Sequence, residues 1–171
     1  RVQRCAATML GWLATLTHPD GGIAFFNDAA FGIAPDLKVL EERAKSLGVT
    51  SPAPPYAPGM TRLTDSGFVR VDCADAALFL DVGRVGPDYL PGHAHADTLS
   101  FECSLGDERI IVNSGTSLYG NGPERQRQRG TAAHNTVVVD GEDSSEVWGG
   151  FRVARRARPF DLSVAQTESS F

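Results

Sequence analysis

The sequence predicts an all-β sandwich or barrel preceded by a short helical segment. Apolar residues recur at helical spacing before residue 50, whereas after residue 60 they alternate with polar residues in short runs separated by turn signals. Between these two parts, the stretch TSPAPPYAPG has four prolines in ten residues, which is typical of a linker. We therefore expect a helical segment at residues 1–49, a linker at 50–60 and a β domain at 61–171.

Two amphipathic helices are expected in the first part. The first runs from Val2 to Thr17 and ends at the turn sequence HPDGG. The second lies in APDLKVLEERAKSLG, where Pro35 suits the first turn and Gly48 suits the position just after the last turn. Apolar residues at helical spacing mark one face of each helix: Val2, Ala6, Met9, Leu10, Leu13 and Leu16 in the first, and Leu37, Leu40, Ala44 and Leu47 in the second.

The expected strands begin after the linker. GFVRVDC and AALFLDVG alternate as strands do, and TLSFECSLGDERIIVNSG predicts two strands around the turn LGDE. HNTVVVDGED predicts a strand that ends in a turn at Asp140 and Gly141, and GFRVARRARP predicts another that ends at Pro159. Several short strands with turn signals between them favour a sandwich or a barrel.

Composition excludes several classes of partner. The chain has 171 residues and a net charge of −5, so no overall basic field favours nucleic acid. No apolar run approaches the ~20 residues of a membrane-spanning helix. The three cysteines form no CxxC pattern, which argues against a disulfide framework or a thiolate zinc site. Because the chain starts at Arg1 without Met and stops at Phe171 just after an alternating segment, we expect it to be a piece of a larger protein.

The segment GHAHADTLSF carries the most chemical information. His93, His95 and Asp97 alternate, and the alternation continues into Leu99 and Phe101. On a strand these five side chains would share one face, with the polar groups at the head of a core stripe. Two imidazoles at positions i and i+2 of a strand can converge on a divalent metal, although a hydrogen-bonded pair of histidines would have the same spacing.

Further ligands for such a metal can be named. His134 lies at the start of the strand predicted in TAAHNTVVV, so a third imidazole would enter the β core at a strand end. An oxygen from Asp97 or Asn113 could complete the site, or Asp97 could instead orient an imidazole from outside it.

The segment NSGTSLYGNGPERQRQRGT predicts a long glycine-rich loop, and loops of that length are often functional. Tyr119 could transfer a proton there, or it could pack the loop. Arg125, Arg127 and Arg129 alternate and could bind carboxylates, although a charged run is more often a solvated surface. Arg152, Arg156 and Arg158 would add to a local basic patch. An acidic polymer is one partner for that patch, and protection of an edge strand is the other explanation.

Three segments, GHAHADTLSFECSLGDERIIVNSGT, YGNGPERQRQRGTAAHNTVVVDGEDSSE and FNDAA, resemble the heparinase II/III-like family of polysaccharide lyases, which includes alginate and heparan lyases. The resemblance implies an antiparallel β-sandwich preceded by the end of an α/α toroid. It also implies an acidic polysaccharide as substrate, the toroid domain of the full-length protein as partner, and a periplasmic or secreted bacterial setting.

The resemblance assigns roles to individual residues. His95 and His134 match zinc ligands of the family, and Asn113 stands where the family has an aspartate ligand, so zinc is expected to bind more weakly here. His93 matches a residue that faces the catalytic cleft, and Tyr119 matches a catalytic acid or base. From their residue types and positions, Asp97 would lie behind the ligands, and the loop residues Arg125 and Arg129 would bind substrate carboxylates.

These residues suit β-elimination from a uronate-containing chain, which requires a base, an acid and stabilisation of an enolate-like intermediate. The family's other catalytic residues lie on the toroid and match no position here, so the isolated piece is expected to be inactive. The alternative is a non-catalytic, metal-stabilised β module that binds carbohydrate or a protein partner. A cupin-like oxygenase is disfavoured, because the glutamate expected at position 99 or 100 is replaced by Leu99 and Ser100.

Overall fold

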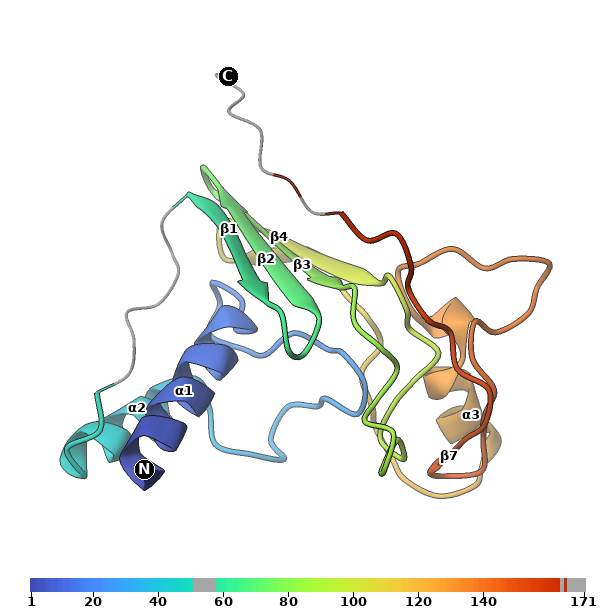
Figure 1. Cartoon of the computed structure of the whole chain (residues 1–171), viewed down its shortest axis with the longest axis horizontal. Helices are drawn as coiled ribbons and strands as arrows, with labels where there is room; N and C mark the ends of the chain where they lie inside the picture. Colours follow the sequence, from blue (N-terminus) through green and yellow to red (C-terminus); the bar gives the residue numbers. More distant parts are fainter. Residues whose placement is uncertain (51–57, 164, 166–171) are drawn as a thin grey trace.

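A computed structural model describes residues 1–50, 58–163 and 165 of the chain. Its helices are α1 (Val2–Thr15), α2 (Leu37–Ser46), α3 (Pro123–Arg129) and the 3-10 turn η1 (Thr131–Ala133). Its strands are β1 (Gly59–Leu63), β2 (Phe68–Cys73), β3 (Ala76–Asp81), β4 (Phe101–Leu105), β5 (Glu108–Ile111), β6 (Val147–Trp148) and β7 (Arg152–Val153). Figure 1 shows the predicted order, with helices first and an antiparallel sheet after them. The mainly β fold with a short helical segment is confirmed.

The two helices of the first part form close to the predicted positions and pack on each other. Leu10 and Ala14 of α1 make a buried cluster with Leu37 of α2. Gly48 follows the end of α2 with φ +69°, a left-handed conformation that glycine adopts at little cost. Pro35 does not occupy the first turn of α2 as predicted, because the helix begins after Asp36.

The sheet is a meander in which β1, β2, β3, β4 and β5 pair with their neighbours in chain order, all antiparallel. One face packs on the chain that follows α1. The buried cluster on this face consists of Leu16, Ala24, Phe26, Phe68, Ala77 and Phe79. Each large apolar side chain buried there contributes about 1.5–3 kcal/mol to stability. The helical segment and the sheet therefore share a core.

The prediction of a strand through GHAHADTLSF is wrong over its first nine residues. β4 begins only at Phe101, and Leu99 is exposed with φ +63°. The backbone N–H of Ala96 donates to the carbonyl of Arg129, and the N–H of Ser100 donates to the carbonyl of Asp97. One partner lies within the segment and the other at the end of α3, so the segment is a loop that is closed by a local turn and held in place by Arg129.

Two further strand predictions are only partly correct. HNTVVV forms no strand within the described residues; a single bridge joins Val139 to Glu142 across the predicted turn. That turn is confirmed, with φ +53° at Asp140 and +76° at Gly141, as a tight hairpin turn requires. In GFRVARRARP only β7 is extended and paired, and its partner is β6.

The predicted glycine-rich loop contains a helix. Pro123 starts α3 directly after Gly122, a favoured arrangement for a first turn. The alternating arginines therefore sit on a helix, with Arg125 and Arg129 buried one turn apart and Arg127 exposed. Most of the predicted linker, residues 51–57, lies outside the described residues, and β1 starts within the predicted linker range at Gly59.

The connection between α1 and α2 positions the candidate site. In Figure 1 this light-blue segment leaves α1, passes below the sheet towards the orange part of the chain that contains α3, and returns to α2. It carries Asp28 into contact with the loop before β4 and with α3. Among the described helices, none is long and apolar enough to cross a membrane.

Candidate metal and catalytic centre

One carboxylate, Asp28, holds the centre together. Its Oδ2 accepts from Nδ1 of His93 at 2.8 Å, and its Oδ1 accepts from Nε2 of His95 at 2.7 Å. Thr116 donates its hydroxyl to Oδ1 at 2.9 Å. The guanidinium of Arg125 donates to both oxygens, with NH2 2.9 Å from Oδ2 and NH1 also bound to Oδ1. Four side chains from three separate segments thus meet on one buried group.

The environment of Asp28 keeps this carboxylate ionised. Burial by itself raises the pKa of Asp28, but hydrogen bonds from His95, Arg125, His93 and Thr116 outweigh it and hold the pKa far below its usual range. An ionised carboxylate only accepts hydrogen bonds. Each histidine must therefore present an N–H to it.

His95 and His134 form a pair of neighbouring imidazoles. Their ring centroids are 5.3 Å apart, and both side chains are buried. Nδ1 of His95 has no hydrogen-bond partner among the described residues, and neither ring nitrogen of His134 has one with good geometry, although the carbonyl of Gln128 lies near that ring. Burial, and then the nearby His95, lower the pKa of His134 to about 3, although the carbonyl of Gln128 opposes this. His134 is therefore neutral at ordinary pH, the form that binds a metal.

Asn113 contacts the residue that follows His134, and its amide oxygen is already in use. Oδ1 accepts from the backbone N–H of Asn135 at 3.0 Å and from its Nδ2 at 3.4 Å. Nδ2 of Asn113 is buried without a partner within the described part of the chain. The backbone N–H of Asn113 donates to Glu102 at 2.7 Å, which fixes the position of the residue.

These residues fit a divalent metal at two of the three expected ligands. The partnerless nitrogens of His95 and His134 have the chemistry of zinc ligands. Asn113 can add only a neutral oxygen that two donors already share. The described residues contain no group of three or more His, Cys, Asp or Glu side chains that could hold a metal.

The two predicted catalytic side chains lie together at the surface. The rings of His93 and Tyr119 are 6.1 Å apart between centroids, and Phe151 contacts both at 5.5 and 5.1 Å. The side chain of His93 is 62% exposed, and Tyr119 is 53% exposed. The guanidinium of Arg125 lies 5.2 Å from the centre of the Tyr119 ring. His93 and Tyr119 are thus linked to the buried histidine pair through Asp28 and Arg125.

The sequence profile of the family described as Heparinase II/III-like, C-terminal matches residues 56–170. The chain belongs to this heparinase II/III-like family. No curated protein matches the sequence.

Solved structures of heparinases contain a region with the same fold as this heparinase II/III-like chain. A crystal structure of heparinase III is 15% identical with a TM-score of 0.60, and the match covers 85% of this chain and 28% of that one. Another heparinase III gene product is 21% identical with a TM-score of 0.59, and the match covers 79% of this chain and 24% of that one. Heparan sulfate lyase from Pedobacter heparinus is 18% identical with a TM-score of 0.53, and the match covers 76% of this chain and 23% of that one. The chain thus spans about a quarter of the length of these proteins.

Arg125 and Arg129 are not displayed on an open loop, which corrects their predicted placement. Both are fully buried. Besides Asp28, Arg125 donates to the carbonyl of Gly150 at 3.0 Å. Within the described part of the chain Arg129 donates only to backbone carbonyls, with the shortest contact 2.9 Å to Ala94. Their binding of substrate carboxylates stays a prediction.

Asp97 forms its side-chain hydrogen bond with a backbone N–H and not with an imidazole, which was one of the roles considered from the sequence. It is buried, and its Oδ2 accepts from the backbone N–H of Asn27 at 3.2 Å. The carboxylate that accepts from His95 is Asp28. Asp97 therefore fixes the chain next to Asp28 and acts one step further from the imidazoles. Asp28 had no assigned role in the sequence; the only signal for it was the FNDAA segment.

A second buried polar group, centred on His18, had no role assigned from the sequence. Nδ1 of His18 forms a hydrogen bond with Oγ of Ser104 at 2.6 Å. Nε2 of the same ring forms one with Oε2 of Glu102 at 2.8 Å. The other oxygen of Glu102 accepts from the N–H of Asn113. The turn after α1 is thereby connected to the segment that carries Asn113.

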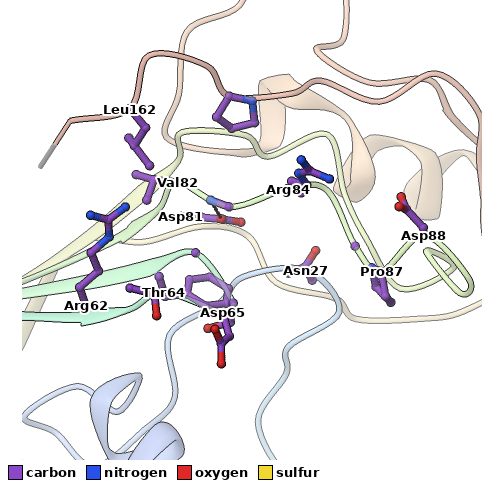
Figure 2. A pocket seen from close by; sticks show the side chains of 16 residues that line it. Asn27, Arg62, Thr64, Asp65, Asp81, Val82, Arg84, Pro87, Asp88 and Leu162 are labelled. Atoms are coloured by element: carbon purple, nitrogen blue, oxygen red, sulfur yellow. Dashed lines mark hydrogen bonds between the residues drawn. The ribbon is translucent and has the colours of Figure 1, made fainter.

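A hollow of about 650 Å³ lies away from the histidines, between the β1–β2 turn, the chain after β3 and Leu162 (Figure 2). None of the four histidines lines it. Asp81 does, and it is buried; burial, and then the charge of Asp97, raise its pKa to about 7.

Proposed function

We propose that this chain supplies one half of the active site of a polysaccharide lyase, which cleaves a uronate-containing acidic polysaccharide by β-elimination. The observation that carries the proposal is the pairing of His93 and Tyr119 at the surface, 6.1 Å apart between ring centroids. The toroid of the full-length protein would supply the opposite wall of the cleft, and a periplasmic or secreted bacterial setting belongs to the same proposal.

The reaction needs two proton transfers. A base removes the proton at C5 of the uronate, the electron pair forms a C4–C5 double bond, and the C4–O4 bond breaks with a proton delivered to the leaving oxygen. His93 and Tyr119 can serve as this pair, each contributing ~10²–10⁴-fold. Nε2 of His93 is the nitrogen available to substrate, because Nδ1 is bound to Asp28.

Two arginines support the developing negative charge. The charge of Arg125 is balanced by Asp28, whereas Arg129 has only carbonyl partners within the described residues. Its positive charge therefore contributes to the potential at the cleft, where the enolate-like intermediate forms. In this proposal the two guanidinium groups also attract the carboxylates of the substrate.

Zinc, held by His95 and His134 with a neutral oxygen from Asn113, would supply a structural crosslink. The partnerless nitrogens of the two imidazoles support this part of the proposal. The crosslink would join the loop that carries His93 to the segment after α3. The metal takes no part in the proton transfers.

The test uses full-length protein and the absorbance of the unsaturated uronate product, with a panel of uronate polymers as substrates. Tyr119→Phe removes the hydroxyl and keeps the ring, so kcat should fall ~10²–10⁴-fold while thermal stability stays nearly unchanged. Tyr89→Phe is the matched control, because Tyr89 is 88% exposed and has no assigned role. Normal turnover in Tyr119→Phe would exclude Tyr119 from the reaction. A wild-type protein that cleaves no uronate polymer would support the non-catalytic module instead.

A further inference from the structure

We propose that Asp28 is a positioning residue that sets opposite tautomers on His93 and His95 and so joins the metal site to the catalytic histidine. The inference rests on the proposed function and adds a residue to it. Asp28 contacts the two imidazoles through different oxygens, Oδ2 to Nδ1 of His93 and Oδ1 to Nε2 of His95.

The tautomers follow from the hydrogen bonds. An ionised carboxylate accepts only, so the neutral imidazole facing it must carry its proton on the nearer nitrogen. In His95 that nitrogen is Nε2, which leaves the lone pair on Nδ1, the atom with no partner among the described residues. In His93 it is Nδ1, which leaves the lone pair on Nε2 at the exposed side of the ring. One carboxylate thus directs one lone pair inwards and the other outwards.

Arg125 and Thr116 hold the carboxylate in the required orientation. The guanidinium spans both carboxyl oxygens, and the threonine hydroxyl adds a third donor at Oδ1. With these partners in place, Asp28 cannot rotate without breaking several hydrogen bonds at once.

The backbone around Asp28 is fixed on both sides. The N–H of Asn27 is bound by Asp97, and the carbonyl of Ala29 accepts from the N–H of Thr116 at 3.1 Å. Gly115 packs so closely on that carbonyl that a Cβ there would lie 2.8 Å from the oxygen. Asp28 therefore sits in a rigid cradle formed by two other segments, as a group that positions others needs.

The first test measures tautomers and needs no variant of Asp28. Full-length protein labelled with ¹⁵N-histidine is studied by long-range ¹H–¹⁵N correlation, with signals assigned by their loss in His93→Gln and His95→Gln. We expect His93 to carry its proton on Nδ1 and His95 on Nε2. The opposite tautomer at either ring would overturn the inference. This readout stands even if the protein has no lyase activity.

The second test uses Asp28→Asn, which keeps the shape but presents an amide N–H₂ where one imidazole requires an acceptor. We expect zinc affinity, measured by chelator competition, to fall ~10–100-fold. The kcat for lyase activity should fall ~10²–10⁴-fold with little change in KM. In a folded Asp28→Asn protein, unchanged zinc affinity together with unchanged kcat would overturn the inference.

Asp20→Asn is the matched control. Asp20 lies in the same connection and also binds an arginine, with Oδ2 2.7 Å from Nε of Arg109, but it hydrogen-bonds no imidazole. Its substitution should leave zinc affinity, tautomers and kcat unchanged. If Asp28→Asn unfolds because Arg125 loses its partner, the double variant Asp28→Asn with Arg125→Gln removes the unpaired charge. It should fold and show the same loss of zinc affinity.

Discussion

Oε2 of Glu102 lies 2.8 Å from Nε2 of His18, and both side chains are completely buried. Glu102 extends from the sheet and His18 from the turn after α1, so this pair connects the two parts of the fold. Through its other oxygen, Glu102 also holds the N–H of Asn113. The pair therefore supports the core and one side of the candidate metal centre.

Glu102→Gln should destabilise the protein through this pair. The amide keeps the volume of the side chain, but it replaces charge-assisted hydrogen bonds with neutral ones. It also requires His18 to carry its proton on Nδ1, towards Ser104, so that Nε2 can accept from the amide. We expect a loss of ~1–3 kcal/mol in the free energy of unfolding, measured by urea denaturation. Glu108→Gln, at an exposed position of the neighbouring strand, is the control and should have almost no effect. Equal stability of the two variants would contradict this account.

Asn113→Asp should strengthen zinc binding. A carboxylate supplies the anionic ligand that the amide lacks, and it can still accept the N–H of Asn135. We expect at least a ~10-fold gain in zinc affinity, measured by chelator competition on full-length protein. Asn121→Asp, which also changes an amide that accepts a backbone N–H, serves as the control. A zinc affinity that does not change in Asn113→Asp would mean that this residue does not face the metal.

Asp81→Asn should stabilise the protein at alkaline pH but not at pH 4. Burial, and then Asp97, raise the pKa of Asp81 from 3.8 to about 7 in the folded chain. Between these values the unfolded chain has lost the proton that the folded chain retains, so stability falls as pH rises through this window. Asparagine cannot ionise, so it avoids this loss.

The gain at pH 8 should be ~2–4 kcal/mol, and it should disappear near pH 4. Urea denaturation at both pH values measures it. Asp65→Asn changes an exposed carboxylate that lines the same hollow, and it should show no such pH dependence. A gain for Asp81→Asn that is equal at both pH values would argue against titration of Asp81.

Local periodicity was sufficient to predict the two long helices and the strands from β2 to β5. It failed at GHAHAD, because the backbone partners that hold this segment as a loop come from Arg129 and Pro91 and not from an adjacent strand. It also failed at PERQRQR, where seven residues are too few to separate a helical from an alternating pattern. The signal that favoured a helix there was Pro123 directly after a glycine.

The sequence predicted some contacts of the candidate site and missed the one that depends on a distant segment. His93 and Tyr119 do meet, and His95 and His134 do lie side by side. Asp28, which binds two of these four, is 65 residues from His93 in sequence and belongs to a segment without a spacing pattern. Hydrogen bonds over such separations depend on the tertiary fold, which no local period encodes.

Arg129→Gln and Arg127→Gln should differ sharply although both arginines lie on α3. Arg129 is fully buried and donates to the carbonyls of Ala94, Trp148, Gly149 and Arg152. Glutamine reaches fewer of these oxygens, so several buried acceptors lose their donor, and the free energy of unfolding should fall by at least ~2 kcal/mol. Arg127 is exposed, and its one ion-pair partner among the described residues is Glu124, so solvent screens the contact and its loss should change stability little.

Urea denaturation of the two variants in full-length protein measures this difference, and lyase kinetics separate it from substrate binding. If Arg129 only stabilises the fold, Arg129→Gln should be less stable than wild type and should lose activity only in proportion to the fraction of unfolded protein. An Arg129 that also binds the carboxylate of the substrate predicts, in addition, a higher KM at temperatures where Arg129→Gln is fully folded. If Arg129→Gln unfolds as readily as wild type and only KM rises, the carbonyl contacts do not stabilise the fold, and Arg129 is primarily a substrate-binding residue.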